Sequence, residues 1–403
     1  MGRHILFLTH YFPPEVNAPA SRTYEHAKRW VKKGVRVTVI TNNPNHPLGK
    51  LFPGYTNRFL SREAIDGINV IRVKTFLIPH IGISKRAANY LFFAFMAIVA
   101  SFFVRNFDVV LATSPQIFCG IAGSLISKAK RKPFVLEIRD LWPGQVVALN
   151  VIKSRLLLGI MERLEKFLYR AADGIVTTTG FQRTYILMMA HPNRVTTIPN
   201  AADLELFRSV SSNSIQDHPL AGKFVASYIG FFGMLYALYI ILDTAKAVES
   251  YKDIHFLLVG DGANKNVVQE RCEELGLKNV TLMPFQSRSE IVRLISISDV
   301  GLLILKGDQL FETSVPAKMF EYLAMKRPVI FATRKGEGSK LVEKHDCGLV
   351  IEPEDSTKLK EAILKLYSDS NLRKKLGLNG YRAVQQYYNR DIMADMMLDA
   401  IFT

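Results

Sequence analysis

A short segment near residue 320 combines residue types that suit a diphosphate and a sugar. Residues 313–330 read TSVPAKMFEYLAMKRPVI, which predicts a turn closing on Pro316, a short helix, and a strand starting at Pro328. The first turn of a helix presents unpaired N–H groups and partial positive charge, which suit a pyrophosphate. Lys318 adds a cation there, and Glu321 could accept both hydroxyls of a ribose. By pattern alone, the segment is better explained as an ordinary amphipathic helix that buries Met319, Phe320 and Leu323.

Two glycine-containing turns could bring backbone N–H groups to the same phosphates. YIGFFGM at 228–234 follows a predicted strand and precedes a helix predicted to begin near Leu235, so Gly230 and Gly233 would leave a diphosphate unobstructed by Cβ atoms. VGDG at 259–262 lies at the carboxyl end of a strand, where open α/β sheets bind ligands. This second turn lacks the GxGxxG fingerprint of a dinucleotide site.

Alternating strands and helices must position these segments. The chain has 403 residues and 48% hydrophobic content, enough for two domains with separate cores. Short runs rich in Val, Ile and Phe alternate with helical stretches, which is typical of parallel sheets. A polar, aperiodic stretch at 209–223 predicts a domain boundary, and the end of the chain is helical in pattern. Strands are predicted near 4–8, 35–40, 68–73, 108–112, 134–138, 174–177, 224–229, 254–259, 280–283, 299–304, 328–331 and 348–351.

Nearly the whole chain resembles one enzyme family. The segment 313–330, with PNAADLELF at 199–207 and VGDG at 259–262, resembles the retaining family-4 glycosyltransferases of the GT-B fold. THYFPPEVNAPASR at 9–22 and RDLWPG at 139–144 narrow the resemblance to bacterial O-antigen and capsule transferases, including N-acetyl-L-fucosamine transferases.

The resemblance implies an α/β fold of two Rossmann-like domains that face each other across a cleft. An acceptor-binding, membrane-associating domain would span 1–207 and a nucleotide-sugar-binding domain 208–377. A C-terminal helix over 378–403 would return to the N-terminal domain. The donor would be a UDP-sugar whose base lies near Met283 to Phe285. Its predicted binding residues are Gly230, Gly233, Gly260, Phe285, Thr313, Ser314, Val315, Pro316, Ala317, Lys318 and Glu321.

The chain departs from the family pattern at two places in the donor site. Many members carry two glutamates separated by seven residues, but with Glu321 as the second, the first falls on Thr313, and Glu312 is displaced by one. Members also often place Arg and Lys after the glycine turn, where residues 234–237 supply no cation, so Lys318 would substitute. A threonine in an apolar pocket would suit a deoxy sugar, and a preference for glucose would contradict that hypothesis.

The resemblance places the acceptor side in the first βα loop. Glu15 could orient or deprotonate the acceptor hydroxyl, or it could be a loop carboxylate paired with Arg22. His10 is a second catalytic candidate, or a structural residue that caps a strand. Asn17 and Arg22 would contact the acceptor. Arg139 would pair with Asp140 and face a phosphate, while Asn200 and Asp203 match an interdomain motif whose simplest role is hinge geometry.

Charge and one apolar segment suggest the partners. Lys and Arg outnumber Asp and Glu by 15 in residues 1–207 but by only 1 in 208–403, which predicts an anionic partner for the first half. Residues 87–104 carry no charge and lie at the lower length limit for a membrane span. Because a strand resumes directly afterwards, a helix that dips into one leaflet is favoured, with basic residues at 22–36 or 128–132 meeting headgroups. The alternative is a buried helix. Nucleic-acid binding lacks any accompanying motif.

Metal, disulfide and export signals are missing from the sequence. Cys119, Cys272 and Cys347 show no CxxC or Cys/His spacing, and there is no DxD motif or metal-spaced cluster. The N-terminus lacks a signal-peptide pattern. We therefore expect an enzyme without metal or cofactor at the cytoplasmic face of the inner membrane, either peripheral or monotopic.

Together these features predict retaining transfer from a UDP-sugar, with N-acetyl-L-fucosamine as a candidate donor sugar, to a polyprenyl-diphosphate-linked sugar in O-antigen or capsule biosynthesis. Two alternatives remain open. A UDP-sugar 2-epimerase would share the fold and the nucleotide site but would not use a membrane-seeking helix. A non-enzymatic, membrane-bound nucleotide-binding adaptor would not need Glu15.

Overall fold

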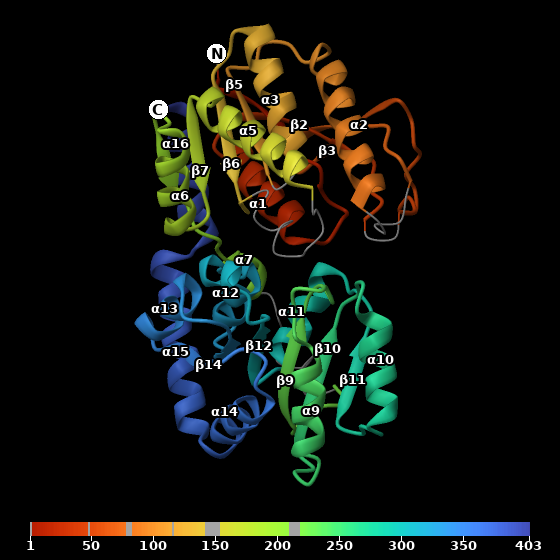
Figure 1. Cartoon of the computed structure of the whole chain (residues 1–403), viewed down its shortest axis with the longest axis vertical. Helices are drawn as coiled ribbons and strands as arrows, with labels where there is room; N and C mark the ends of the chain where they lie inside the picture. The colour runs from red at the N-terminus through yellow and green to blue at the C-terminus, as the bar shows by residue number, and fades with distance from the viewer. Residues whose placement is uncertain (1, 47–48, 78–82, 115–116, 142–153, 209–217) are drawn as a thin grey trace. The chain divides into compact units, whose positions relative to one another are not determined.

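The chain folds into two compact α/β units. A computed structural model describes residues 2–46, 49–77, 83–114, 117–141, 154–208 and 218–403. The first unit comprises Met1–Pro199 with Asp391–Thr403, and the second comprises Asn200–Arg390 (Figure 1). Each unit is built around one mainly parallel sheet, so the predicted two-domain architecture is confirmed.

The first unit contains a sheet in the order β3-β4-β2-β1-β5-β6-β7-β8, parallel except where β3 pairs antiparallel with β4. Its strands are β1 (His4–Leu8), β2 (Arg36–Asn42), β3 (Leu60–Ile65), β4 (Ile68–Val73), β5 (Val109–Thr113), β6 (Phe134–Ile138), β7 (Gly174–Thr177) and β8 (Val195–Thr197). Its helices are α1 (Ala18–Lys32), α2 (Ile83–Ser101), α3 (Ile117–Lys130), α5 (Arg155–Ala171), α6 (Gly180–Ala190) and α16 (Arg390–Phe402).

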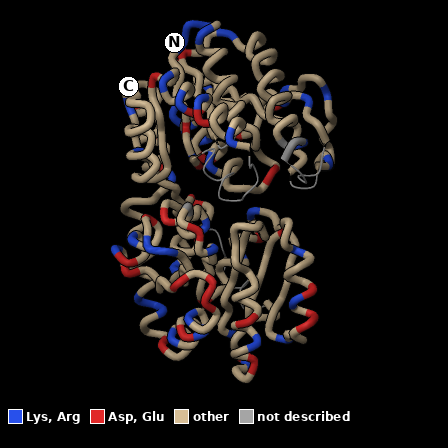
Figure 2. Tube along the Cα trace, in the orientation of Figure 1, with Lys and Arg blue, Asp and Glu red and all other residues tan. Residues whose placement is uncertain are grey.

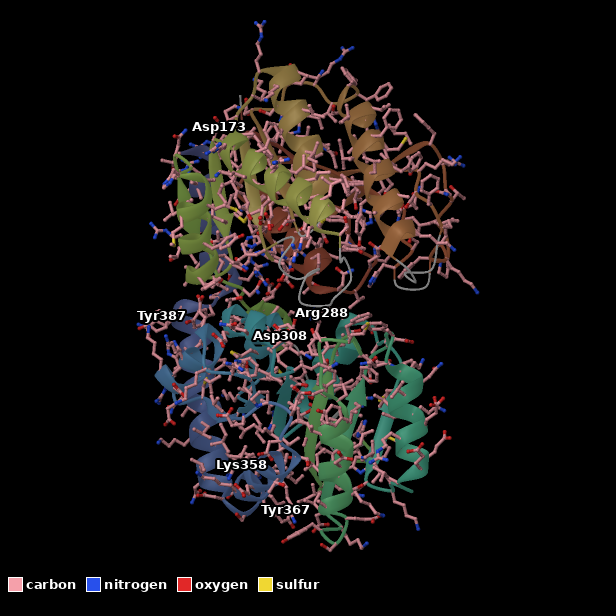
Figure 3. The ribbon with its side chains drawn as sticks, in the orientation of Figure 1. Asp173, Arg288, Asp308, Lys358, Tyr367 and Tyr387 are labelled. Atoms are coloured by element: carbon pink, nitrogen blue, oxygen red, sulfur yellow. The ribbon has the colours of Figure 1, made fainter. Side chains whose placement is uncertain are left out.

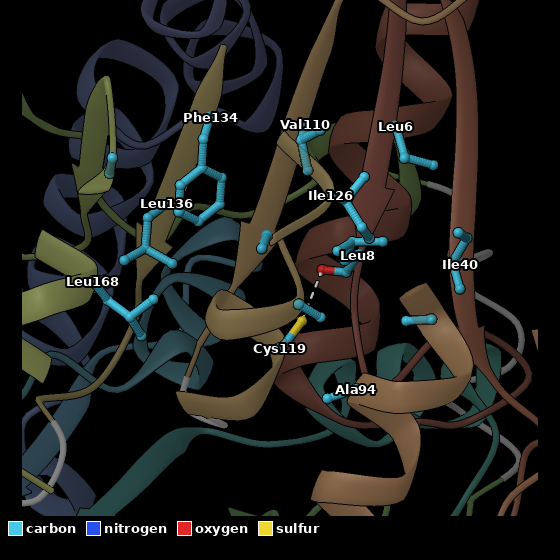
Figure 4. Packing of buried hydrophobic residues seen from close by; sticks show 14 of the residues in the cluster. Leu6, Leu8, Ile40, Ala94, Val110, Cys119, Ile126, Phe134, Leu136 and Leu168 are labelled. Carbon is cyan, nitrogen blue, oxygen red and sulfur yellow. Dashed lines mark hydrogen bonds between the residues drawn. The ribbon is translucent and has the colours of Figure 1, made fainter. Parts of the chain in front are cut away.

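The central strands of this unit are buried and mostly apolar because helices cover both faces of a parallel sheet. Every residue of β1, β5 and β6 is buried. Figure 4 shows part of the core, in which Leu8 of β1, Leu136 of β6 and Leu168 of α5 pack together with α3. In this core the Cys119 Sγ donates a hydrogen bond to the Leu8 carbonyl oxygen at 3.3 Å, so Cys119 packs as a core residue.

The second unit contains a fully parallel sheet in the order β11-β10-β9-β12-β13-β14. Its strands are β9 (Phe224–Ile229), β10 (Ile254–Val259), β11 (Val280–Met283), β12 (Val300–Ile304), β13 (Val329–Ala332) and β14 (Gly348–Ile351). The helices are α7 (Leu204–Arg208), α9 (Tyr239–Ala247), α10 (Lys265–Glu274), α11 (Arg288–Ser296), the 3-10 turn η1 (Gln309–Thr313), α12 (Ala317–Ala324), α13 (Glu337–Lys344), α14 (Ser356–Ser368) and α15 (Ser370–Tyr387).

The boundary between the units lies at Pro199/Asn200, eight residues before the predicted boundary after residue 207. The segment 200–207 belongs to the second unit because it is held there by backbone and side-chain contacts. Asn200 Nδ2 donates to the Val315 carbonyl oxygen at 3.4 Å, and Ala202 forms an isolated bridge with Asn389. The polar stretch used to predict the boundary mostly falls on 209–217, outside the described residues.

The C-terminal stretch predicted as one helix over 378–403 is two helices. Residues up to Tyr387 belong to α15 of the second unit, and α16 begins at Arg390. Between them the backbone pairs with Ala202, whose N–H donates to the Tyr388 oxygen at 3.0 Å and whose oxygen accepts from Arg390 N at 2.9 Å. In the first unit, Trp30 Nε1 donates to the Ala394 oxygen at 2.8 Å, which ties α16 to α1.

The apolar segment 87–104 forms most of α2, which ends at Ser101. One face packs into the core through Phe93, Met96 and Ala97, each at most 1% exposed. Leu91 and Phe95 are 58% and 59% exposed, so α2 is buried on one side only. Within the described part of the chain, no helix combines the length and apolar character that crossing a bilayer requires. Lys and Arg are more frequent than Asp and Glu over the first unit, while both signs alternate over the second (Figure 2).

Candidate functional site

Two glycine turns meet at the carboxyl ends of β9 and β10 in the second unit. Gly230 and Gly260 have φ of 152° and 154°, values that L side chains rarely adopt. A Cβ on Gly260 would lie 1.8 Å from the Gly230 carbonyl oxygen, so the turns are in backbone contact. Gly230 N donates to the Val259 oxygen and Gly260 N to the Met283 oxygen, each at 2.9 Å. The two predicted turns are therefore brought together.

The loop after β9 is longer than predicted. The helix expected near Leu235 begins at Tyr239, because residues 231–238 form a turn held to neighbouring backbone. Phe232 N donates to the Asp261 oxygen at 2.8 Å, and Asn264 Nδ2 donates to the Gly233 oxygen at 3.1 Å. This arrangement links the first glycine turn to the second.

The helix α12 forms where the sequence predicts it. Pro316 is its N-cap residue, Lys318 lies in its first turn, and β13 follows at Val329. A Cβ on Gly230 would lie 3.0 Å from Lys318 Nζ, so the amine lies at the first glycine turn. The structure thereby joins three predicted donor-site elements, namely the two turns and the start of α12.

Lys318 is held in an aromatic cage. Its Nζ lies 3.6 Å from the centre of the Tyr228 ring and 5.0 Å from that of Tyr236. The amine is buried and has no hydrogen-bond partner among the described residues. Burial lowers its pKa from 10.5 to about 7, although Glu321 acts in the opposite direction. A buried ammonium beside aromatic rings would be stabilised by an anion that supplied hydrogen-bond acceptors.

The acidic residues near α12 already have cationic partners. Glu321 Oε1 accepts from Arg288 Nη1 at 2.7 Å, with the side chains 18% and 26% exposed. Glu312 Oε1 pairs with Arg334 Nε at 2.7 Å, so this displaced carboxylate is directed to a surface arginine. Of the other predicted donor residues, Thr313 ends η1, Ser314 N donates to the Phe311 oxygen, and Phe285 is half-buried beyond β11.

Glu15 is buried by the loops that surround it. Its Oε1 accepts from Asn45 N at 3.0 Å and His46 N at 2.9 Å, and its Oε2 from Phe12 N at 3.4 Å. Burial raises the pKa of Glu15 to about 7, against the effect of these donors and Arg72. The carboxyl group thus joins the loops after β1 and β2, and its catalytic role stays a prediction.

Arg22 does not pair with Glu15, so that alternative is wrong. Its Nε donates to Glu137 Oε1 at 2.7 Å, with both side chains 1% exposed, and its Nη1 donates to the Pro199 oxygen at 2.8 Å. Burial acts to raise the pKa of Glu137, but the charges of Arg22 and Arg139, together with hydrogen bonds from Arg22 and Thr113, keep the pKa below its usual value. Arg22 has a structural role at this position, and its predicted contact with an acceptor stays untested.

Replacing Arg22 with Ala is expected to destabilise the first unit. The change would leave Glu137 buried without its ion-pair partner, which costs about 3–5 kcal/mol. Thermal unfolding measures the loss, and Lys33→Ala is the control because its pair with Asp395 is about half exposed and is worth about 0–1 kcal/mol. Equal melting temperatures for the two variants would contradict the structural role.

The remaining acceptor-side candidates lie at strand and helix ends of the first unit. The His10 ring is buried, lies 3.0 Å from Asn42 Nδ2, and packs edge-on against Tyr90 and Phe93. Asn17 is the N-cap of α1, where its Oδ1 accepts from Ala20 N at 2.9 Å. The backbone of Arg139 follows β6 and is fixed by Ser114 Oγ and Gln182 Nε2 at 2.9 and 2.8 Å.

Several site residues were missed from the sequence. Arg288, Tyr228 and Tyr236 contact the predicted residues Glu321 and Lys318, but they lie 33 or more positions away along the chain. Glu137 lies inside the buried strand β6. A charged residue within an apolar run indicates that a partner of opposite charge is buried with it, and this pattern could have identified Glu137 from the sequence. Residues 142–144 of the RDLWPG motif lie outside the described residues.

Comparison with known proteins agrees with this architecture. The family model "Glycosyl transferase 4-like domain" matches residues 17–201, and "Glycosyl transferases group 1" matches residues 216–383. WcaI of Escherichia coli, a glycosyl transferase assigned to colanic acid biosynthesis, is 22% identical over 78% of this chain and 79% of its own length. The alpha-D-kanosaminyltransferase of Streptomyces kanamyceticus is 24% identical over 40% of each chain.

Solved structures share the fold over nearly the full length. Sucrose-phosphate synthase from Thermosynechococcus elongatus superposes with a TM-score of 0.78 at 16% identity, covering 98% of both chains. HepE of Anabaena, in complex with UDP and glucose, gives a TM-score of 0.73 at 17% identity, covering 99% of both chains. With the two family models matched in succession along most of its length, this chain belongs to the glycosyltransferase superfamily with the GT-B fold.

Proposed function

We propose that the protein transfers a sugar, with retention, from a UDP-sugar to a polyprenyl-diphosphate-linked sugar during O-antigen or capsule synthesis. The observation that carries this proposal is the buried amine of Lys318 beside the Gly230 turn at the start of α12. A diphosphate bound there would be met by an ammonium and by the N-terminal end of a helix. Charge developing on the leaving phosphate would be stabilised by the same groups.

The choice of a uridine donor is supported by fold relatives. HepE is a full-length structural neighbour whose complex contains UDP. The base would lie against the segment after β11, near Phe285, and Glu321 would bind the ribose. We also expect the diphosphate to be held without metal, because Lys318 and α12 supply the positive charge. Removing divalent cations with a chelator should leave transfer unchanged, and full dependence on Mg²⁺ would contradict this expectation.

The donor sugar to test first is N-acetyl-L-fucosamine. The sequence resemblance points to this sugar, and it also implies that Thr313 takes the place of a family glutamate, which could have accepted sugar hydroxyls. The acceptor would be presented to the first unit, with Glu15 or His10 at its hydroxyl and Asn17 and Arg139 nearby. This part of the proposal rests on the loops after β1 and β6.

A panel of donors tests the function. UDP- and GDP-sugars are incubated with purified protein and a short lipid diphosphate carrying N-acetylglucosamine, and mass spectrometry follows the glycolipid and the released nucleotide. We expect one UDP-sugar to give a mass-shifted glycolipid with stoichiometric UDP. UDP release with an altered free sugar would instead identify an epimerase, and nucleotide binding without turnover would identify an adaptor.

We also propose that the first unit docks on the cytoplasmic face of an anionic membrane. Phe102 and Phe103, which follow α2, are 60% and 58% exposed, close to the value for Phe95. Lys130 Nζ lies 4.9 Å from the centre of the Phe102 ring, so a cation accompanies the exposed aromatic side chains. Aromatic residues with neighbouring cations suit the headgroup region of an anionic leaflet.

Replacing Phe95, Phe102 and Phe103 together with Ser should greatly weaken vesicle binding. These side chains are exposed, so the fold should lose little stability. Co-sedimentation with vesicles of phosphatidylglycerol and phosphatidylcholine measures the effect, and Val267→Ser in the second unit is the control because Val267 is 63% exposed. Unchanged sedimentation of the triple variant would contradict this docking face.

A further inference from the structure

Three side chains from separate segments of the second unit form a row that ends at the predicted ribose ligand. The Arg288 guanidinium lies 5.4 Å from the centre of the Phe207 ring, and its Nη1 donates to Glu321 Oε1 at 2.7 Å. Phe207 belongs to α7, Arg288 begins α11, and Glu321 lies in α12. Arg288 is labelled in Figure 3.

Each member of this row is held by its own element. Phe207 is 4% exposed, and its helix starts where Asp203 Oδ1 accepts from Glu205 N at 3.2 Å. Ser287 caps α11 by accepting from Glu290 N at 3.3 Å, which fixes Arg288 at the first position of that helix. A planar guanidinium held over a buried ring loses little freedom when it binds a carboxylate. The PNAADLELF segment thus supplies a support for Arg288.

Two cations interact electrostatically with Glu321. Lys318 lies one turn earlier on α12, and Glu321 raises its pKa through their opposite charges. The hydrogen bond of Glu321 goes to Arg288, while Lys318 Nζ has no hydrogen-bond partner among the described residues. A carboxylate has about four acceptor positions, so one bond from Arg288 leaves positions for two ribose hydroxyls. The ammonium of Lys318 stays available for phosphate.

We propose that Arg288, supported by Phe207, is a positioning residue that aims the Glu321 carboxylate at the donor ribose and keeps it from pairing with Lys318. This inference rests on the proposed UDP-sugar site. Loss of Arg288 should therefore have a selective effect on binding, because it should impair recognition of the ribose hydroxyls more than recognition of the base.

The test compares UDP with 2′-deoxy-UDP by calorimetry on the full chain. We expect the wild type to prefer UDP by roughly tenfold or more, as for a hydrogen bond to a charged group. In Arg288→Gln the preference should fall to about twofold or less, mostly through weaker UDP binding. Glu321→Gln should give the same loss, and the double variant should add little to it. Phe207→Leu should give a partial loss.

Arg373→Gln is the matched control. Arg373 also pairs with a carboxylate, that of Asp299 at 3.3 Å, and its guanidinium lies 5.2 Å from the Phe224 ring in the same unit. It should keep the wild-type preference even if the melting temperature falls. An equal loss of UDP and 2′-deoxy-UDP affinity in Arg288→Gln, or an unchanged ratio, would overturn the positioning role. Absence of UDP binding by the wild type would instead remove the proposed function.

Discussion

Replacing Lys318 with Met should make the protein more stable and abolish the UDP binding that we propose for it. The amine is buried against Tyr228 and Tyr236 without a hydrogen-bond partner among the described residues. Its pKa is lowered from 10.5 to about 7. A change of one in the pKa corresponds to about 1.4 kcal/mol, so burial of the ammonium costs several kcal/mol near neutral pH. An apolar side chain of similar length removes that cost and also removes the cation that a diphosphate needs.

The stability difference should depend on pH with a definite sign. Because the folded-state pKa is below the unfolded value, the unfolded chain binds more protons between pH 7 and about 10.5, and wild-type stability rises with pH there. Lys318→Met should therefore melt well above the wild type at pH 6.5, with the gap narrowing by pH 9. A variant that melts below the wild type at both values would contradict the buried, unpaired amine.

The affinity for UDP should change in the opposite direction with pH. On the proposed site, a diphosphate would bind the charged form of Lys318, so binding would take up a proton once the pH exceeds about 7, the pKa of Lys318 in the ligand-free protein. Affinity should then fall by up to about tenfold per pH unit. Calorimetry at pH 6.5 and 8.5 measures this, and Lys318→Arg should bind UDP without that pH dependence. A flat wild-type profile would show that Lys318 is not the phosphate ligand.

Replacing Gly260 with Ala should disrupt the site and strongly destabilise the second unit. A Cβ there would lie 1.8 Å from the Gly230 oxygen, at a φ of 154° that Ala rarely adopts. The two turns would have to separate, which would displace the backbone beside Lys318. We expect a loss of about 3 kcal/mol or more and of UDP binding.

Gly276→Ala is the control for backbone strain alone. Gly276 also has a positive φ, 61°, but a Cβ added at this position would meet no described atom within 4 Å. This variant should lose only about 1–2 kcal/mol and keep its affinity for UDP. If Gly260→Ala matched it in melting temperature and UDP affinity, the contact between the turns would not be essential.

Most strands of the two sheets could be predicted from the sequence because buried parallel strands are continuous apolar runs. The prediction at 134–138 is confirmed by β6, whose residues are all buried, and the series in the second unit is confirmed from β9 to β14. Two strands were missed. β3 is a partly exposed edge strand with the polar sequence LSREAI, and β8 has three half-buried residues, so neither presents an apolar run.

The candidate site could be predicted only as far as local patterns reach. The position of Lys318 in the first turn of α12 follows from Pro316 and the apolar spacing after it. The aromatic cage around Lys318 and the ion pair of Arg288 with Glu321 depend on which strands and helices become neighbours in the fold. The spacing of residues along the chain does not predict these neighbours. For the same reason, the ion pair of Arg22 with Glu137, which lies 115 positions away, could not be predicted.

Hydrogen–deuterium exchange with and without saturating UDP tests the central claim most directly, because it locates the nucleotide on the chain. We predict slower exchange in peptides covering 229–236, 259–264 and 313–321, and weaker protection in these peptides for Lys318→Met. UDP binding that protected other segments and left these three unchanged would contradict the site derived from the glycine turns and α12.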